Sequence, residues 1–429
     1  MKLRMPNNKR NRKQNEIIVI AGPSSSGKST FLKTNDYINC SPEHKTVFAY
    51  DIEVCLPNVD TYIVHYNTLR VVDKAYPDNA NGSVSEYGAS LVTPDFSKDK
   101  AWKVLKDQKQ RLRVITIVAL EKEIWERVRT RKCIEKERDT NNQYPTDRWI
   151  GHFLKIDLEK HYRAWLSELS KCEIPIELVK FRDGQYKKIQ DVESSLREIN
   201  MTPDEEKEVI GEFFSESPAK SKYQRVECPQ SGGLEGQDRS SSVNLVLNNM
   251  RAGESVLDVG CAQGLFCFEA ERRGASVVHG VDIKLERFET ARLLARLQQS
   301  RAEFYLRDVS EWPITQRYDV VLLLNVIHHL HFPLKVLYDL SQITNRILIV
   351  EFPGMTDPKY CDTVQSDSGS GDGMPLIGVS LLDEKDQTFV FSPEAIRRVL
   401  VRHIYGFKSV EIMQSPMKNR YIAVCKKYL

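Results

Sequence analysis

The sequence predicts an α/β protein made of two doubly wound domains, and three observations carry this prediction. Two glycine-rich turns, at residues 22–27 and 260–264, each follow an apolar run and precede a segment that can form a helix. Apolar runs alternate with longer amphipathic segments in both halves of the chain, which is typical of parallel sheets covered by helices. Between the halves, residues 215–236 are rich in Ser, Pro, Gly and Lys, which favours a linker.

Composition favours an ordinary globular protein. The 429 residues are 41% hydrophobic and 28% charged, and the net charge of +3 is too small to indicate a nucleic-acid partner by itself. No apolar run approaches the ~20 residues that cross a bilayer, and the first residues lack the apolar core of a secretory signal. The nine cysteines contain no C-x-x-C pair, so neither a disulfide framework nor a zinc site is favoured. We therefore expect a cytoplasmic location.

Residues 1–15 carry six basic side chains and no acidic one. The segment is rich in Asn and has no apolar periodicity, so we expect a solvated, disordered tail. The alternative is peripheral contact with an anionic membrane at the inner membrane face, at about 1 kcal/mol per basic residue. The domain boundaries that we expect are 1–15 for the tail, 16–200 for the first domain, 201–236 for the linker and 237–429 for the second domain.

The first glycine turn fits G-x-x-x-x-G-K-[ST] at every position from Gly22 to Ser29. It follows the apolar run 16–21, so the order strand, glycine loop, helix is the context that a phosphate-binding P-loop requires. In such a loop successive N–H groups point at phosphate oxygens. Lys28 would reach the β- and γ-phosphates of ATP, and the Ser29 hydroxyl would bind Mg²⁺. The expected nucleotide-binding residues are Gly22, Ser26, Gly27, Lys28, Ser29 and Thr30.

Further strands are expected around this loop at residues 45–50, 61–66, 113–120 and 174–179. Ligands of parallel sheets collect at the carboxyl ends of the strands. Asp51 and the turn at residues 65–67 each follow a strand, so both are expected on the same rim as the P-loop. Residues 149–169 are expected to form a long amphipathic helix that packs in the core.

The segment after the strand at 113–120 resembles the small P-loop kinases. It carries Arg127, Arg129 and Arg131, and in that family an arginine-bearing helix leads into a lid that closes over the phosphates. Cations are needed there because charge spreads over the transferring phosphoryl oxygens. Asp51 resembles the acid that receives the acceptor's proton. The resemblance implies that Lys28, Asp51, Arg127 and Arg131 are catalytic; the alternatives are a solvated helix with a Glu123–Arg127 pair and a turn at Asp51.

The second glycine turn lies between two acids that end strands. Asp258 precedes the turn Gly260–Gly264, and Asp282 follows about 20 residues later, at the spacing by which an acid grips ribose hydroxyls. The turn reads G-x-A-x-G, without the third glycine of a pyrophosphate-binding turn. It resembles the class I S-adenosylmethionine (AdoMet)-dependent methyltransferases, although that family usually has glycine where this chain has Ala262.

The methyltransferase resemblance covers residues 237–429 and implies a Rossmann-like seven-stranded sheet with AdoMet as cofactor. Strands are expected at 303–308, 318–325 and 346–352, followed by an antiparallel pair at 409–413 and 420–425. The residues that the resemblance implies for AdoMet binding are Asp258, Gly260, Gly264, Asp282, Asp308 and Asn325.

Three histidines follow the strand at 318–325, and they raise the question of a metal site. His328 and His329 are neighbours and diverge by about 100° on a helix, so they cannot both face one ion. We expect them to line the AdoMet pocket or to cap the helix, with His328 as a candidate general base. The long segment 353–391 is expected to build the methyl-acceptor site, and Ser392-Pro393 is expected to start a helix.

Together the two halves predict a bifunctional transferase. The first domain would phosphorylate a hydroxyl, with a glycan end as one candidate, and the second would methylate the same or a related substrate. The pairing resembles, in domain logic only, the kinase–methyltransferase enzymes that terminate bacterial surface polysaccharides. Two alternatives are an RNA end-processing kinase–methyltransferase, which the near-neutral charge disfavours, and a methyltransferase regulated by a nucleotide-sensing P-loop domain.

Overall fold

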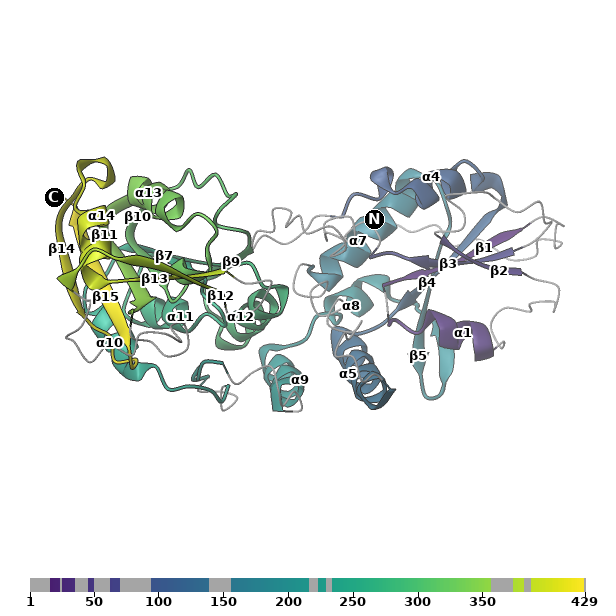
Figure 1. Ribbon diagram of the computed structural model, residues 1–429. Helices are drawn as coiled ribbons and strands as arrows, with labels where there is room; N and C mark the ends of the chain where they lie inside the picture. The colour runs from purple at the N-terminus through teal and green to yellow at the C-terminus, as the bar shows by residue number, and fades with distance from the viewer. Residues whose placement is uncertain are drawn as a thin grey trace. The chain divides into compact units, whose positions relative to one another are not determined.

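The computed structural model describes residues 16–23, 25–34, 45–49, 62–69, 94–138, 156–215, 223–228, 234–355, 373–381 and 387–427. These residues divide into two compact units, which meet in the chain between Phe213 and Phe214. Each unit is built on its own sheet (Figure 1). No helix in the described ranges is long and apolar enough to span a bilayer.

The N-terminal unit is built on a six-stranded sheet in the order β2-β3-β1-β4-β5-β6. The first five strands run parallel, and β6 is antiparallel to β5. β1 lies between β3 and β4, so the chain leaves it toward one edge of the sheet and later returns on its other side. Ligands bind at such a switch point. The strands are β1 Ile17–Gly22, β2 Lys45–Phe48, β3 Tyr62–Asn67, β4 Leu112–Val118, β5 Ile176–Arg182 and β6 Gln185–Lys188.

Helices cover both faces of this sheet, as Figure 1 shows for α4 and α7 on one side and α1 and α5 on the other. Successive side chains of a strand point to opposite faces. Accordingly Ile18, Ile20 and Ile117 pack with Phe31 of α1, while Tyr66 stacks on Trp165 of α7 with ring centroids 5.4 Å apart. The helices are α1 Lys28–Thr34, α4 Lys100–Lys106, α5 Glu121–Arg138, α7 Leu158–Lys171, α8 Val192–Arg197 and α9 Pro203–Ser215, with the short turns η2 Phe96–Lys98 and η3 Lys109–Arg111.

The C-terminal unit contains the predicted seven-stranded sheet, which is confirmed in the order β14-β15-β11-β10-β7-β8-β9. Five strands are parallel, and the last two form the expected antiparallel pair. β7 lies at the switch point, between β8 and β10. The strands of this sheet are β7 Ser255–Val259, β8 Val277–Asp282, β9 Glu303–Leu306, β10 Tyr318–Leu324, β11 Thr344–Pro353, β14 Phe407–Gln414 and β15 Arg420–Lys427.

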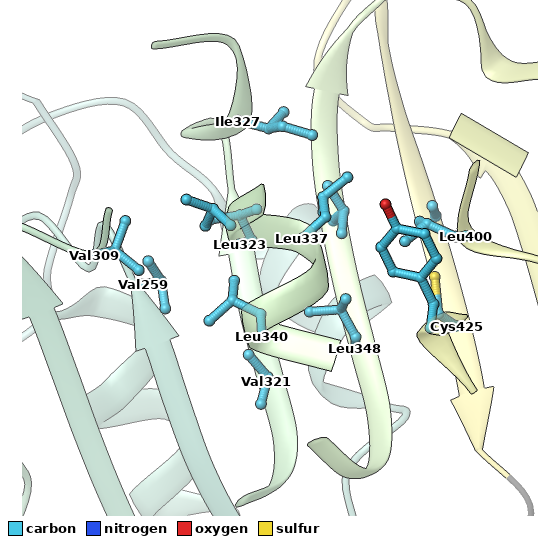
Figure 2. Packing of buried hydrophobic residues seen from close by; sticks show 14 of the residues in the cluster. Val259, Val309, Val321, Leu323, Ile327, Leu337, Leu340, Leu348, Leu400 and Cys425 are labelled. Carbon is cyan, nitrogen blue, oxygen red and sulfur yellow. The ribbon is translucent and has the colours of Figure 1, made fainter. Parts of the chain in front are cut away.

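One core of the C-terminal unit lies between the sheet and helices α13 and α14. Figure 2 shows Val259, Leu323 and Leu348 of the sheet against Leu337 and Leu340 of α13, and all of these side chains are buried. Helices α10, α11 and α12 cover the other face (Figure 1). The helices are α10 Ser240–Leu247, α11 Leu265–Arg272, α12 Leu285–Gln298, α13 Pro333–Ile343 and α14 Pro393–Leu400, with the short turns η4 Ile327–His329 and η6 His403–Tyr405.

The structure gives the bounds of elements in two segments that the sequence pattern left open. Residues 201–236, expected as a linker with an acidic helix start at residues 202–208, contain the 13-residue helix α9. It begins with a capping box in which Thr202 and Glu205 exchange hydrogen bonds. Within the long segment 353–391, β12 Ile377–Leu381 and β13 Gln387–Phe391 form a separate antiparallel pair. The expected helix 149–169 is described only as α7, which begins at Leu158 because Asp157 caps it.

Candidate functional site

The second glycine loop joins β7 to α11 at the carboxyl edge of the seven-stranded sheet. The amides of Gly260 and Cys261 both donate to the Val281 carbonyl of β8, at 2.7 and 3.0 Å. Gly260, Ala262 and Gly264 have φ of 74°, 50° and 85°, a backbone region that favours glycine. Ala262, the departure from the family pattern, is therefore a non-glycine residue in left-handed backbone. The loop is thus fixed to β8 by its own backbone.

Asp282, at the end of β8, binds the glycine loop directly. One carboxylate oxygen accepts from the Ala262 amide at 2.9 Å and the other from the Lys284 amide at 2.8 Å. The Arg287 guanidinium lies 3.9 Å away. Burial raises the pKa of Asp282, against the opposing effect of these hydrogen bonds. The predicted ribose-gripping acid and the predicted loop are therefore brought together.

Asp258 lies beneath the same loop, on β7, with 2% of its surface exposed. The Cys267 thiol of α11 donates to it at 3.7 Å. Burial, helped by the nearby charge of Asp282, raises the pKa of Asp258 to about 7. A carboxyl that titrates near neutral pH beside a glycine loop is a candidate for ligand contact.

Asp308 and Asn325 follow β9 and β10 on the same edge. Asp308 accepts from the Ser310 amide at 2.8 Å, and the Arg307 amide donates to the carbonyl of Asp282 at 3.0 Å, which joins the two strand ends. Asn325 has φ of 60° and donates its backbone amide to the Glu351 carbonyl at 3.0 Å. All six residues that were predicted to bind AdoMet therefore lie at the carboxyl ends of β7, β8, β9 and β10 or in the loop after β7.

A buried polar network underlies Asn325, and the sequence reasoning missed it. The fully buried carboxylate of Glu351 accepts from Arg239 at 2.7 Å and also from Asn325 and Ser415. The Asn325 carboxamide in turn accepts from Arg420. The signal for Glu351 was an acid inside the otherwise apolar run of β11. Arg239, which precedes α10, carried no comparable signal.

His328 lies in the turn η4 after β10 and is 1% exposed, and its ring centroid is 4.0 Å from that of His329. His331 is exposed. Among the described residues no group of three or more His, Cys, Asp or Glu side chains is arranged to hold a metal ion.

The first glycine loop joins β1 to α1 in the N-terminal unit. Gly22 and Gly27 have φ of 151° and 99°, and Ser25 has φ of 59°. The Lys28 side chain is 3% exposed, and its ammonium donates to the carbonyls of Gly22 and Pro23 at 3.0 and 2.6 Å. Among the described residues, the buried hydroxyls of Ser25 and Ser26 have no hydrogen-bond partner. Buried hydroxyls are normally hydrogen-bonded, so these two are available to a ligand.

The predicted rim around this loop holds His65 of β3. Its Nε2 lies 3.4 Å from the Ser29 hydroxyl. Burial, assisted by the charge of Lys28, lowers the pKa of His65 to about 4. Asn67 pairs with Gly22 in the sheet, and the Thr68 amide donates to the Gly22 carbonyl at 3.0 Å. The turn at 65–67 and the glycine loop therefore share one edge.

Arg127 of α5 contacts the glycine loop. Its Nη1 donates to the Ser25 carbonyl at 2.9 Å, and its Nη2 lies 3.7 Å from Glu123. The structure thus contains both the expected i,i+4 pair and a contact with the loop. Arg131 belongs to α5 but its side chain is outside the described residues, and Asp51 lies outside them altogether. Their predicted roles stay predictions.

Tyr186 of β6 is a further loop contact that the sequence reasoning missed. Its hydroxyl donates to the Gly27 carbonyl at 2.9 Å. β5 and β6 pair across a two-residue turn, Asp183-Gly184, with φ of 51° and 76°. Asp-Gly between two strands is a strong hairpin signal, so the signal for this element was present in the sequence.

Part of the C-terminal unit matches a known protein family. Residues 256–345 match the family described as "Methyltransferase domain". Curated relatives include a ubiquinone biosynthesis O-methyltransferase from Nitrobacter winogradskyi, 32% identical over 81 residues, which are 19% of this chain and 31% of the relative. A ribosomal protein L11 methyltransferase from Cupriavidus pinatubonensis is 38% identical over 90 residues, which are 21% of this chain and 28% of the relative. The chain thus spans about a third of the length of these curated relatives.

Two solved structures are similar to part of this chain. The N-terminal domain of EvdMO1, solved in the presence of SAH and D-fucose, is 16% identical with a TM-score of 0.39, and the match covers 51% of this chain and 96% of that one. Magnesium protoporphyrin IX methyltransferase from Synechocystis PCC 6803, with bound SAH, is 21% identical with a TM-score of 0.33, and the match covers 44% and 81%. The family match over the glycine loop and its flanking strands decides the assignment: the C-terminal unit contains a class I AdoMet-dependent methyltransferase domain.

Proposed function

We propose that the chain transfers a methyl group from AdoMet, which binds at the carboxyl edge of the seven-stranded sheet. The observation that carries the proposal is the glycine loop at the switch point, between two buried carboxyls. The donor set fits AdoMet, since its ammonium and ribose hydroxyls need acceptors and its carboxylate needs a cation. Asp258 and Asp282 are such acceptors, and Arg239 is a buried arginine that donates to Glu351 and whose charge acts on Asp258.

Each residue has a role in this proposal. AdoMet supplies an electrophilic methyl group on a sulfonium when it is bound. Asp282 would accept from the ribose hydroxyls, Asp258 would lie near the methionine part, and Asp308 would lie near the adenine. Glycine fits at positions 260 and 264 because the backbone there is left-handed and because an added Cβ would lie 2.2 Å from Val326 and 2.8 Å from Phe304. His328 remains the candidate general base.

Labelled AdoMet tests the proposal. The full chain is incubated with methyl-labelled AdoMet and fractionated extracts of the native host, and labelled products are identified by mass spectrometry. A product that appears with the wild-type chain and is absent with Asp282→Asn supports the proposal. Failure of the wild-type chain to bind AdoMet or S-adenosylhomocysteine in calorimetry would sink it.

We propose as a second function that the N-terminal unit binds ATP and Mg²⁺ and transfers a phosphoryl group. One observation favours it: the buried Lys28 ammonium, Arg127 and two serine hydroxyls with no hydrogen-bond partner in the described part of the chain gather at a single glycine loop. Lys28 and Arg127 offer cations for the phosphates, and Ser29 offers a hydroxyl to Mg²⁺. Asp51 and Arg131 remain the proposed acceptor base and lid cation.

The two activities would act on one substrate or on related substrates, with a hydroxyl-bearing glycan as the first candidate acceptor. The alternatives are an RNA end and a regulatory, nucleotide-sensing role of the first unit. Peripheral contact with an anionic membrane is proposed only for residues 1–15, which lie outside the described residues.

Transfer from γ-labelled ATP separates these possibilities. With Mg²⁺ and a glycan acceptor fraction, the kinase proposal expects labelled glycan with the wild-type chain and none with Lys28→Ala. Label in RNA, with salt-sensitive RNA binding, favours end processing. If Lys28→Ala changes methyl transfer while no phosphorylated product forms, the nucleotide-sensing alternative holds.

A further inference from the structure

The β5–β6 hairpin holds Tyr186 rigidly beside the first glycine loop. The Tyr186 ring meets Phe31 of α1 edge-on, with centroids 4.8 Å apart, and meets Phe181 of β5 at 5.0 Å. Burial raises the pKa of Tyr186, so its hydroxyl stays protonated at neutral pH and can donate. The ring cluster fixes the side chain, and the hydroxyl is then directed at one acceptor, the Gly27 carbonyl at 2.9 Å.

The Gly27 carbonyl belongs to the same peptide plane as the Lys28 amide. In a trans peptide the C=O and the N–H point in opposite directions. A hydrogen bond that fixes the carbonyl therefore also fixes the direction of the Lys28 N–H. Gly27 O also accepts from the Phe31 amide at 2.9 Å, so both of its acceptor positions are used by the protein.

The glycine at position 27 fits this arrangement for two reasons. Its φ of 99° is unfavourable for other residues, and a Cβ there would lie 2.8 Å from the Tyr186 hydroxyl. The same Cβ would lie 3.7 Å from Arg127 Nη1, which holds the Ser25 carbonyl. Two side chains from α5 and β6 thus approach the loop's carbonyls together.

We propose that Tyr186 is a positioning residue of the glycine loop, whose hydroxyl holds the Gly27–Lys28 peptide with its N–H directed at the phosphates of a bound nucleoside triphosphate. The inference rests on the proposed nucleotide binding by the N-terminal unit. It assigns a role in phosphate binding to a side chain 159 residues away in the chain from the carbonyl that it holds.

Tyr186→Phe in the full chain tests the proposal, because it removes the hydroxyl and keeps the ring. Binding of Mg²⁺–ATP and of inorganic tripolyphosphate is measured by calorimetry. Loss of one hydrogen bond that orients an amide is expected to weaken both by about threefold to tenfold, with an unchanged melting temperature. Phe181→Leu removes one ring of the cluster that fixes Tyr186 but keeps the hydroxyl, so it is expected to weaken binding of both probes less than Tyr186→Phe does.

The outcomes separate the positioning role of Tyr186 from the proposed nucleotide binding on which it rests. If the wild-type chain binds neither probe, nucleotide binding itself fails, and the role of Tyr186 fails with it. If the wild type binds, Lys28→Ala does not, and Tyr186→Phe binds like the wild type, only the positioning role is overturned. Weaker ATP binding with unchanged tripolyphosphate binding also overturns it, because the hydroxyl would then act on the nucleoside.

Discussion

The two glycine loops of this chain follow the same plan, strand–loop–helix at a switch point, but they are fixed by different means. The loop at 260–264 is tied to β8 by two backbone bonds to Val281 and by Asp282. The loop at 22–27 accepts one backbone bond, from Thr68 to Gly22, and is tied in addition by side chains from distant elements, Arg127 and Tyr186. The loop at 260–264 lies beside the buried carboxyls of Asp258 and Asp282, whereas the loop at 22–27 encloses the buried ammonium of Lys28. The difference indicates that two glycine loops of similar backbone can differ in the ligand they bind through the sign of the charge beside them.

The largest expected effect comes from filling the space at the second loop. Gly264→Ala adds a Cβ that would lie 2.8 Å from the Phe304 ring, at φ of 85°. Backbone strain and overpacking together should cost about 3 kcal/mol or more, measured as unfolding of the C-terminal unit in urea, and AdoMet binding should be lost.

Gly253→Ala is the matched control for this substitution. Its φ is 86°, but nothing lies within 4 Å of the added Cβ, so only the backbone strain of about 1–2 kcal/mol is expected. Equal destabilisation by the two variants would show that packing against Phe304 does not hold the loop.

The next largest effect concerns the acid that binds the second loop. Asp282→Asn keeps the shape but removes the charge, and its amide group faces the donors of Ala262 and Lys284. Charge-assisted hydrogen bonds contribute about 1.5–3 kcal/mol, so AdoMet should bind tenfold to a hundredfold more weakly in calorimetry.

Asp319→Asn serves as the control for Asp282. Asp319 lies at the start of β10 and accepts from the Ser255 amide at 2.9 Å, away from the carboxyl edge. The Asp319→Asn substitution should lower the stability of the C-terminal unit and leave AdoMet affinity as in the wild type. An equal loss of affinity in both variants would mean that Asp282 acts only through folding.

A buried acid in one unit and buried histidines in the other predict opposite responses to pH. Burial raises the pKa of Asp258 to about 7, so this carboxyl destabilises the C-terminal unit as pH rises from about 4 to about 7. Burial lowers the pKa of His65, and of the buried residue His161 of α7, to about 4. These side chains are neutral when folded, so the N-terminal unit gains stability as pH rises from about 4 to about 6.5.

Hydrogen exchange resolves the two units and checks these signs. From pH 5 to pH 7.5, protection corrected for intrinsic rates should rise in β1 and fall in β7. A pKa that differs by one between the folded and unfolded states can change protection by up to about tenfold. Asp258→Asn cannot ionise and should remove much of the fall in β7. Protection that rises in both strands would contradict the assignment.

The contrast between the loops also explains what could be predicted from sequence. The loops, the strands that precede them and the acids at Asp258 and Asp282 follow from local patterns, because glycine spacing and apolar periodicity are read within a few residues. Arg239 and Tyr186 could not be placed in this way, since each acts on a partner more than 100 residues away in the chain. The β5–β6 hairpin had a local signal in Asp183-Gly184, but its contact with Gly27 is set by tertiary packing.

The smallest expected effect tests whether the Arg127 side chain contributes to the ATP affinity of the loop at 22–27. Arg127→Lys keeps the charge but replaces the guanidinium that donates to Ser25 with a single ammonium. ATP affinity should fall about threefold, consistent with one weakened hydrogen bond. Arg163→Lys is the control, because Arg163 pairs with Glu159 and Glu193 and not with the loop. Unchanged affinity in Arg127→Lys would mean that the loop keeps its shape without this support. A loss beyond a hundredfold would mean that the phosphates need the planar guanidinium of Arg127 and not its positive charge alone.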